Sequence, residues 1–441
     1  MKPARSVRSC IFLLTALLTA EEVLAQGGPL SFEFRFSNPG ARSLAFGGAF
    51  VALADDATAV FSNPAGLVQL VRSEVSIEGR RASSTTRFTA GGRLSGEPTG
   101  IGLDDVPGLR FDESSAVLSG LSFVSFVFPK EDWAVAVYGH QLAKFRAESQ
   151  TQGFFLAAPD GVGTLRADDF VKSTEFEIFT YGFSGSYRVN DRLSLGVGVG
   201  LFVGESTDRT DAYAPLELTL PEGPFGPNAY AEAARDFTIR TRVDDSSWSY
   251  NFGALWQISS EWRLAGSFRR GPRFDFEGVS ISGPAGPDPE GSSADAGTLP
   301  IKLPDVVSLG LVYRSPGGTT TVSAEWDHVG YSTIIDGLDP DVAGTEGISI
   351  PDANEIHAGV EYALLQWKPA LAFRFGLWIE PDHRFRASGV DLLTMAILRA
   401  GESQLHYAAG VGVAFQSFQL DFGLDFSELA STASLSAIFS F

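Results

Sequence analysis

The exported part of this chain has no cysteine, because the only one, Cys10, lies in an N-terminal stretch with the features of a secretory leader. The stretch has a basic start, an apolar centre and a small-residue ending at Val23-Leu24-Ala25. We therefore expect a signal peptide over residues 1–25 and a mature chain without disulfides or thiol chemistry.

Long apolar runs are absent as well, because no stretch after the leader reaches the length of a membrane-spanning helix. Yet 44% of the residues are hydrophobic, and 35 of them are phenylalanines. Apolar residues that alternate with polar ones are typical of a transmembrane β-barrel, whose strands face lipid on one side. A soluble secreted β-protein, with its apolar faces turned inward, is the alternative.

Positive charge is scarce, since 33 Lys and Arg residues stand against 53 Asp and Glu residues, a net charge of −20. This balance argues against a nucleic-acid partner. Much of the acid lies in segments predicted as loops, where it is either simply solvated or bridged to lipopolysaccharide through divalent cations.

Catalytic signatures are missing too. None of the five histidines stands at metal-ligand spacing from another, and no His-Glu-x-x-His or Gly-x-Ser-x-Gly motif occurs. Acidic residues stand next to His328 and close to His357, but a barrel lumen is ordinarily lined with charged residues, which explains both of these acid–histidine pairs. The sequence thus predicts neither an enzyme nor a bound metal or cofactor.

A strict alternation marks the strands. In Phe418–Phe426 the apolar residues alternate with Gln419, Asp421, Gly423 and Asp425, so the two sets face different media. Similar patterns predict fourteen strands, at 73–90, 115–128, 132–149, 169–188, 191–206, 236–258, 261–280, 302–315, 318–332, 354–365, 368–381, 403–415, 417–427 and 432–441.

The connections between these strands alternate between short turns and long loops, as in an outer-membrane barrel. We predict an all-β fold: a 14-stranded antiparallel transmembrane β-barrel over residues 73–441, monomeric, in the lipid and lipopolysaccharide of the bacterial outer membrane. An even strand count places Phe441 and the segment before the first strand at the same, periplasmic end. Residues 26–72 can then fill the lumen as a hatch, because side chains alone do not fill so wide a barrel.

The hatch segment is rich in residues with special backbone roles. Gly47-Gly48 permits positive φ or close approach of another chain. Asp55-Asp56 before an apolar run is typical of a helix N-terminus, and Asn63 can tie a turn before Pro64. The plain alternative for each of these residues is that it only caps and packs the hatch.

The segment GARSLAFGGAFVALADDATAVFSNPAGL resembles the N-terminal hatch of the FadL family of outer-membrane transporters, and Asn63-Pro64-Ala65 falls where that family has its NPA triplet. PorV-like barrels of secretion systems carry a similar pattern. The terminal Phe441 resembles the signal that barrel-assembly machinery reads. The resemblance implies passive uptake of long-chain fatty acids or aromatic hydrocarbons and lateral release at a kinked third strand, where Gly139-His140 is the expected interruption.

Aromatic residues in a hatch are costly unless they pack together or meet an apolar ligand. We predict that hatch aromatics bind the ligand and that an arginine pairs with a fatty-acid carboxylate, unless it neutralises lumen acids instead. The predicted ligand-binding residues are Phe32, Phe34, Phe36, Phe46, Phe50, Phe61, Arg35 and Arg42. Charges on the strands are expected to pair across the lumen and hold the hatch: Arg263, Arg269, Arg374, Glu325, Asp327 and Asp421.

Two other functions compete with uptake. A PorV-like scaffold would keep its hatch shut and bind proteins through its loops, whereas a diffusion porin would need no hatch. Apolar loop runs at Phe154–Ala158 and Leu392–Leu398 favour a transporter, because they can catch a hydrophobic substrate.

Overall fold

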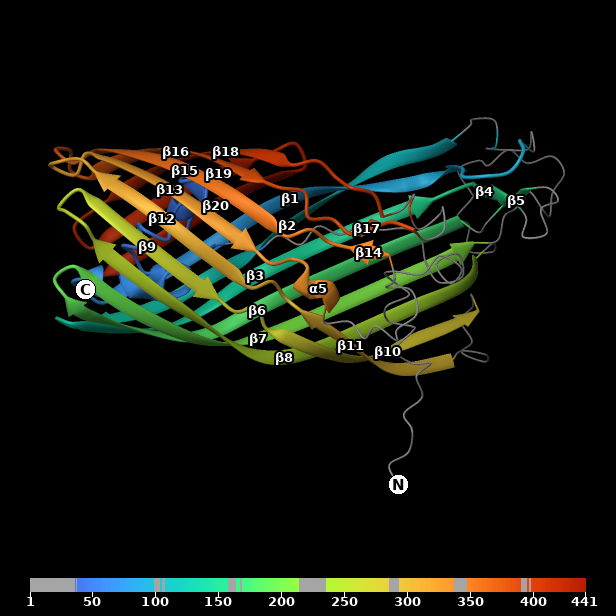
Figure 1. Ribbon diagram of the computed structural model, residues 1–441, viewed down its shortest axis with the longest axis horizontal. Helices are drawn as coiled ribbons and strands as arrows, with labels where there is room; N and C mark the ends of the chain where they lie inside the picture. The colour runs from blue at the N-terminus through green and yellow to red at the C-terminus, as the bar shows by residue number, and fades with distance from the viewer. Residues whose placement is uncertain are drawn as a thin grey trace, which may run out of the picture.

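A computed structural model shows a closed antiparallel β-barrel whose strands run lengthwise through the molecule (Figure 1). The structure describes residues 36, 38–98, 104, 108–157, 164–166, 169–213, 235–284, 293–336, 347–389, 395 and 398–441. The predicted signal peptide and the predicted ligand-binding residues Phe32, Phe34 and Arg35 lie outside this set. Among the described residues, the structure contains no helix with the length and apolarity needed to cross a membrane.

Fourteen antiparallel spanning strands form the barrel, and the pairing of the first with the last closes it. The spanning strands are β1 (Glu74–Arg93), β2 (Gly108–Pro129), β3 (Trp133–Thr151), β6 (Asp169–Asn190), β7 (Leu193–Tyr213), β8 (Arg235–Gln257), β9 (Trp262–Arg269) with β10 (Arg273–Pro284), β11 (Ser293–Lys302) with β12 (Val306–Arg314), β13 (Thr320–Val329), β15 (Ala353–Leu364), β16 (Ala370–Glu380), β18 (Gln404–Ala414), β19 (Phe418–Phe426) and β20 (Ala430–Ser440). The predicted fold class is therefore confirmed.

Several short elements complete the described part of the chain. Before the barrel come α3 (Ala41–Ala45), α4 (Ala59–Ser62) and the 3-10 helix η1 (Pro64–Gln69). The long connections carry β4 (Phe154–Ala157), β5 (Thr164–Arg166), α5 (Thr333–Asp336), β14 (Ile348–Ser349) and β17 (Arg386–Ala387).

Two of the spanning strands are interrupted at the same height. Pairing of β9 with β12 stops at Arg269 opposite Val306, and pairing of β10 with β11 starts at Arg273 opposite Lys302. Each break contains a proline, which has no amide hydrogen to give to the ladder. The prediction of one continuous strand over 261–280 was wrong for this reason. β11 also occupies part of the segment predicted as a loop, because it pairs with β10.

The barrel is apolar on the outside and polar within. In β19, Phe422 and Leu424 are each 39% exposed, whereas Asp421, directly before Phe422, is 1% exposed. Many other strand residues repeat this pattern, with large apolar side chains on the outer surface and polar ones buried. This arrangement suits lipid outside and a polar lumen, and it rules out the soluble alternative, whose apolar faces would point inward.

The hatch, residues 38–72 of the structure, lies inside the barrel near the end that holds the C-terminus (Figure 1). Its helix α3 packs against β16, β18, β19 and β20, whereas η1 packs against β6, β7 and β8. The Phe441 amide donates to the Ser73 carbonyl oxygen at 3.0 Å, so the chain end lies beside the start of β1. The hatch thus spans the lumen between two sides of the wall.

One of the apolar loop runs is not an exposed loop. Phe154 and Phe155 are buried in β4, which pairs in parallel with β1 at Gly92 and Arg93. Because both rings are buried, the expectation that this run catches a substrate stays a prediction. The second run, Leu392–Leu398, lies outside the described residues except for Met395 and Leu398.

Candidate functional site: the hatch and a gap in the wall

The paired glycines of the hatch form a turn against the wall. Gly47 and Gly48 have φ of 64° and 84°, a region that glycine enters without steric cost. The Gly47 carbonyl oxygen lies 2.7 Å from Nδ1 of His357 on β15. The turn therefore brings a backbone acceptor of the hatch onto a wall histidine.

The Asn63-Pro64-Ala65 triplet fastens the other side of the hatch. The buried Asn63 side chain accepts from the Ala65 amide at 3.1 Å and donates to the Val51 carbonyl oxygen at 2.9 Å. It closes the turn that leads into η1, in which Pro64 takes the first position. An asparagine suits this place because its amide supplies both a donor and an acceptor.

The sequence predicts a helix N-terminus at the two hatch aspartates, but the structure does not place them together at one. Helix α4 starts at Ala59 with Thr58 as its N-cap, and Asp56 accepts from the Thr58 amide at 2.9 Å. Asp55 instead accepts from Arg42 and from Arg314 of β12, at 2.6 Å each. The nearby arginines explain the difference, because a charged donor binds a buried carboxylate more strongly than a helix end does.

These contacts belong to a chain of alternating charges across the hatch and the wall. From Asp55 the chain continues through Arg42 to Glu361 of β15, at 3.2 Å. Arg374 of β16 then joins Glu361 at 2.7 Å to Asp421 of β19 at 2.6 Å. Arg42 is thus engaged with lumen acids, which was the alternative to a role in binding a fatty-acid carboxylate.

Other lumen charges hold the hatch through its backbone. Arg263 donates to the Leu53 carbonyl oxygen at 3.1 Å, and Glu325 accepts from the Val51 amide at 2.7 Å. The guanidinium of Arg269 lies 4.6 Å from the centre of the Phe61 ring. The strand charges therefore hold the hatch, although several of them contact its carbonyls, amides and rings rather than one another.

The Asp55 carboxyl is the most strongly engaged acid of the hatch. Burial alone would raise its pKa, but the guanidinium groups of Arg42 and Arg314 outweigh burial and lower the pKa from 3.8 to about 2. An acid whose pKa is depressed in the folded state stabilises it above the unfolded-state pKa, and this stabilisation is lost as the pH falls through the folded-state value.

We therefore expect the stability difference between the wild type and Asp55→Asn to depend on pH. The difference should be nearly full above about pH 4 and mostly lost at about pH 2, where half of the wild-type carboxyls are protonated in the folded state, and it should vanish below that pH. Thermal unfolding of both proteins at about pH 5, 3.5 and 2 measures it. A difference that stays constant over this range would show that Asp55 does not stabilise the hatch through its charge.

The hatch aromatics fall into two groups. Phe46 and Phe50 are fully buried in one packed cluster with Leu53 and with Leu255 and Val312 of the wall. Phe61 packs edge-on against His140, with ring centroids 4.7 Å apart. Phe36 alone among the described aromatic candidates lines the hatch cavity defined below. A ligand-binding role for these phenylalanines stays a prediction.

A gap opens in the wall between β2 and β3. The two strands pair only from Pro129 opposite Ala134 to Phe123 opposite His140. Beyond that point the described part of β2 pairs with β1 alone, and β3 pairs with β6 alone. The pairing of β3 with β6 also shifts between Gln141 and Ala143. The strands therefore separate halfway along the barrel.

The sequence predicts an interruption of β3 at Gly139-His140, but the structure has the interruption one to three residues later. Both residues pair regularly with β2 and β6, and the buried His140 places Nδ1 3.2 Å from the Ser122 carbonyl oxygen. The bulge follows at Gln141–Ala143, where no glycine or proline marks it. Sequence reasoning also missed the other edge of the gap, although the consecutive small residues Ser119-Gly120 already break the alternation of β2.

Two cavities accompany this architecture. The gap cavity, of about 180 Å³, is lined by β1, by Leu118–Gly120 of β2, by Gln141–Phe145 of β3 and by Phe176. The hatch cavity, of about 170 Å³, lies between the hatch and the wall, where Phe36, Gly47, Gly48 and side chains of β13 to β19 surround it. Such cavities beside an opening in the wall suit a small molecule in transit.

Comparison with known proteins identifies the architecture. The family model described as outer membrane protein transport protein (OMPP1/FadL/TodX) matches residues 25–378. The chain belongs to this family. It is an outer-membrane barrel of a family of transporters of hydrophobic compounds, and the scaffold alternative is not favoured. The family is one of transporters and channels rather than enzymes.

Solved structures show the same fold at low sequence identity. The toluene transporter TodX of P. putida is 14% identical, with 92% of this chain and 99% of that chain covered and a TM-score of 0.60. The Ralstonia pickettii toluene transporter TbuX is 16% identical, with 92% and 99% covered and a TM-score of 0.56. The CymD monoaromatic hydrocarbon channel is 15% identical, with 93% and 99% covered and a TM-score of 0.58. A search of curated proteins finds no match.

Proposed function

We propose that this family member takes up small uncharged hydrophobic molecules, with monoaromatic hydrocarbons as the substrate class. The substrate passes beside the hatch and leaves sideways through the gap between β2 and β3 into the membrane. This proposal rests on one observation: β2 and β3 are no longer paired before Phe123 on β2 and after His140 on β3, and a cavity lies at the same place. A hydrophobic molecule that leaves there enters lipid without crossing the aqueous periplasm.

The charges around the gap favour an uncharged substrate over a fatty acid. Three ion pairs lie there. Arg80 Nη2 is 2.8 Å from Glu78 Oε1, Arg87 Nε is 2.7 Å from Glu113 Oε1, and Lys144 Nζ is 3.1 Å from Glu177 Oε2. Each of these cations already has a carboxylate partner, so a fatty-acid carboxylate would have to displace it. The names of the similar structures, which describe toluene transporters and a monoaromatic hydrocarbon channel, support the same class.

A bulky side chain in the gap tests this route. A Cβ atom at Gly120 would have open space around it, so Gly120→Trp is tolerated by β2 and places an indole in the gap cavity. We expect the initial rate of radiolabelled toluene uptake by cells that produce the variant to fall roughly tenfold, the effect of about 1.4 kcal/mol added to the barrier.

The matched control is Gly185→Trp on β6, at a position whose closest neighbouring atom to an added Cβ is 3.8 Å away and which does not line the gap cavity. Its uptake should equal that of the wild type at the same level of folded barrel in the outer membrane. Equal uptake by both variants would refute lateral exit through this gap. Uptake of oleate that exceeds uptake of toluene in the wild type would refute the substrate class.

The remaining partners stay predictions. Phe441 is exposed at the end of the barrel and stacks on Phe126, with ring centroids 6.4 Å apart. We propose that it is the signal for the barrel-assembly machinery, that the loops contact lipopolysaccharide and that the barrel is monomeric.

A further inference from the structure

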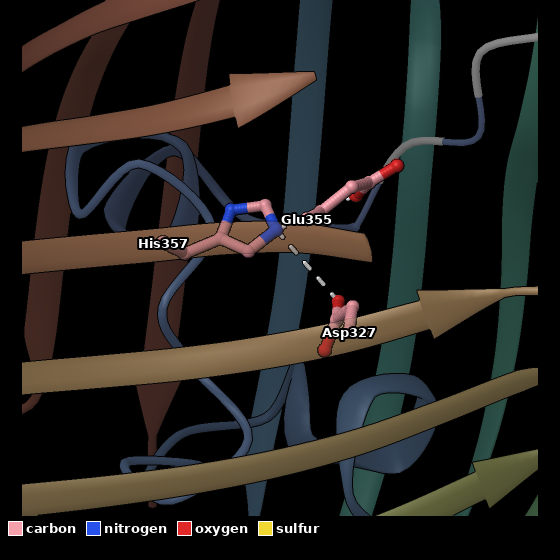
Figure 2. Close-up of side chains that lie close together, drawn as sticks. All are labelled: Asp327, Glu355 and His357. Atoms are coloured by element: carbon pink, nitrogen blue, oxygen red, sulfur yellow. Dashed lines mark ion pairs between the residues drawn. The ribbon is translucent and has the colours of Figure 1, made fainter. Parts of the chain in front are cut away.

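Three side chains with metal-binding chemistry converge beside the hatch (Figure 2). Asp327 comes from β13, and Glu355 and His357 come from β15, the next strand in the wall. His357 Nε2 lies 3.4 Å from a Glu355 carboxylate oxygen and 3.8 Å from an Asp327 carboxylate oxygen. One ligand atom from each residue can be chosen so that all three lie within 4.8 Å of one another.

The histidine is held as a metal ligand would be. Its Nδ1 lies 2.7 Å from the Gly47 carbonyl oxygen, which can only accept, so Nδ1 carries the hydrogen. In the neutral ring Nε2 then presents its lone pair to the two carboxylates. Metal-binding histidines are typically fixed in this way, with the second ring nitrogen donating to a backbone carbonyl or a carboxylate.

Two atoms of the cluster lack hydrogen bonds. His357 Nε2 and Asp327 Oδ1 are both buried and make no hydrogen bond of regular geometry among the described residues, although Nε2 lies within ion-pair distance of both carboxylates. The His357 side chain is only 8% exposed, and it points into the cluster (Figure 2). Buried polar atoms without partners are costly, so a missing ligand is a natural explanation for both.

The carboxylates also exceed the cations on this side of the lumen. Glu325, two residues before Asp327 on β13, adds a third acid that is itself buried, and its Oε1 likewise makes no hydrogen bond of regular geometry in the described part of the chain. Arg269 acts electrostatically on Asp327 and Glu355, but its guanidinium is placed over the Phe61 ring. A divalent cation would neutralise the excess negative charge.

We propose that Asp327, Glu355 and His357 bind a divalent transition-metal ion, Zn²⁺ in preference, on the lumen side of the wall. One imidazole and two carboxylates are ligands that Zn²⁺ accepts, with a water molecule in the fourth position. Bonds of about 2.0–2.2 Å place tetrahedral ligand atoms about 3.3–3.6 Å apart, a range that includes the 3.4 Å between His357 and Glu355. All three residues line the hatch cavity, so the carboxylates have room to rotate onto the ion.

The ion would also tie the hatch to the wall. Through His357 Nδ1 the site is linked to the Gly47 carbonyl of the hatch, and its other ligands fix β13 to β15. We therefore expect Zn²⁺ to raise the unfolding temperature of the full-length barrel as well as to bind it, because a ligand that binds only the folded state stabilises that state.

Titration of the chelator-treated full-length barrel with Zn²⁺ alone, followed by calorimetry, tests the site. We expect one equivalent to bind to the wild type and Asp327→Asn, Glu355→Gln and His357→Gln each to weaken binding roughly tenfold or more. The matched control is His328→Gln, because His328 lies next to Asp327 on β13 but on the opposite face. Co²⁺ absorption provides a second readout, since its visible bands report nitrogen and oxygen ligands directly.

Two results would overturn the proposal. A folded wild-type barrel that binds no stoichiometric Zn²⁺ would mean that the cluster is an ion pair between a protonated imidazole and two carboxylates. Binding that all three substitutions leave unchanged would place the ion elsewhere, on acidic loops. Heat-dependent migration in gels shows whether each variant is folded, and three separate variants keep the test valid if one of them fails to fold.

Discussion

Gly376→Leu is expected to unseat the hatch and turn a closed barrel into an ion-conducting pore. Gly376 lies on the lumen face of β16, where an added Cβ would be 2.2 Å from the Gly47 backbone nitrogen. No side chain fits at that distance, so either the wall or the hatch must move. β16 is hydrogen-bonded along its length to β15 and β18, so the hatch is the part that yields.

Single-channel recording in planar bilayers measures this effect. The wild type should show no conductance steps, and the variant should show stable ones, because the lumen of a fourteen-stranded barrel is too wide for wall side chains to close. Gly253→Leu repeats the test across the lumen, since a Cβ there would be 1.9 Å from the Asn63 side-chain oxygen. Gly185→Leu is the control on the outer face. A silent Gly376→Leu barrel with normal folding would contradict this account of how the hatch is seated.

The barrel itself could be predicted from the sequence because one physical rule governs each strand. Lipid outside and water inside force a two-residue period, and Phe418–Phe426 shows that period without a break. The rule says nothing about where pairing stops. The break between β9 and β10 and the full length of β11 depend on which strand lies opposite, and the sequence of one strand does not reveal that.

The hatch was predictable in its backbone and less so in its contacts. Gly47-Gly48 and Asn63-Pro64 show their turn geometry locally, because positive φ and an amide-tied turn need only neighbouring residues. Asp55 has no such local signal for its partners, since Arg314 lies 259 positions further along the chain. The neighbouring residues predict a helix cap, whereas the structure shows that Asp55 forms a long-range ion pair with Arg314.

Long-range geometry also explains the other differences. The gap edge on β2 is a pairing that fails, and the break in alternation at Ser119-Gly120 does not by itself reveal that β3 is unpaired there. A search for metal ligands by sequence spacing does not find the cluster proposed above, for a related reason. It searches along one chain segment, whereas Asp327 and Glu355 become neighbours only because β13 and β15 pair in register, with these two residues directly opposite each other.

Asp55→Ala is expected to loosen the hatch strongly. Asp55 is the hatch acid in the chain of alternating charges, and it bridges the hatch arginine Arg42 and the β12 arginine Arg314. Its removal leaves two guanidinium groups without this partner, one of them buried. Breaking a buried pair from one side costs about 3–5 kcal/mol, and the partial exposure of Arg314 places the expected value at the lower end.

Hydrogen exchange of the hatch amides, followed by mass spectrometry at neutral pH, measures this loss as faster exchange over residues 41–69. A loss of about 3 kcal/mol corresponds to exchange faster by roughly two orders of magnitude, if opening precedes exchange. The control is Glu113→Ala, which removes an exposed partner of Arg87 and should cost less than about 1 kcal/mol. Protection that Asp55→Ala leaves unchanged would show that packing of Phe46 and Phe50, rather than the charge chain, holds the hatch in the lumen.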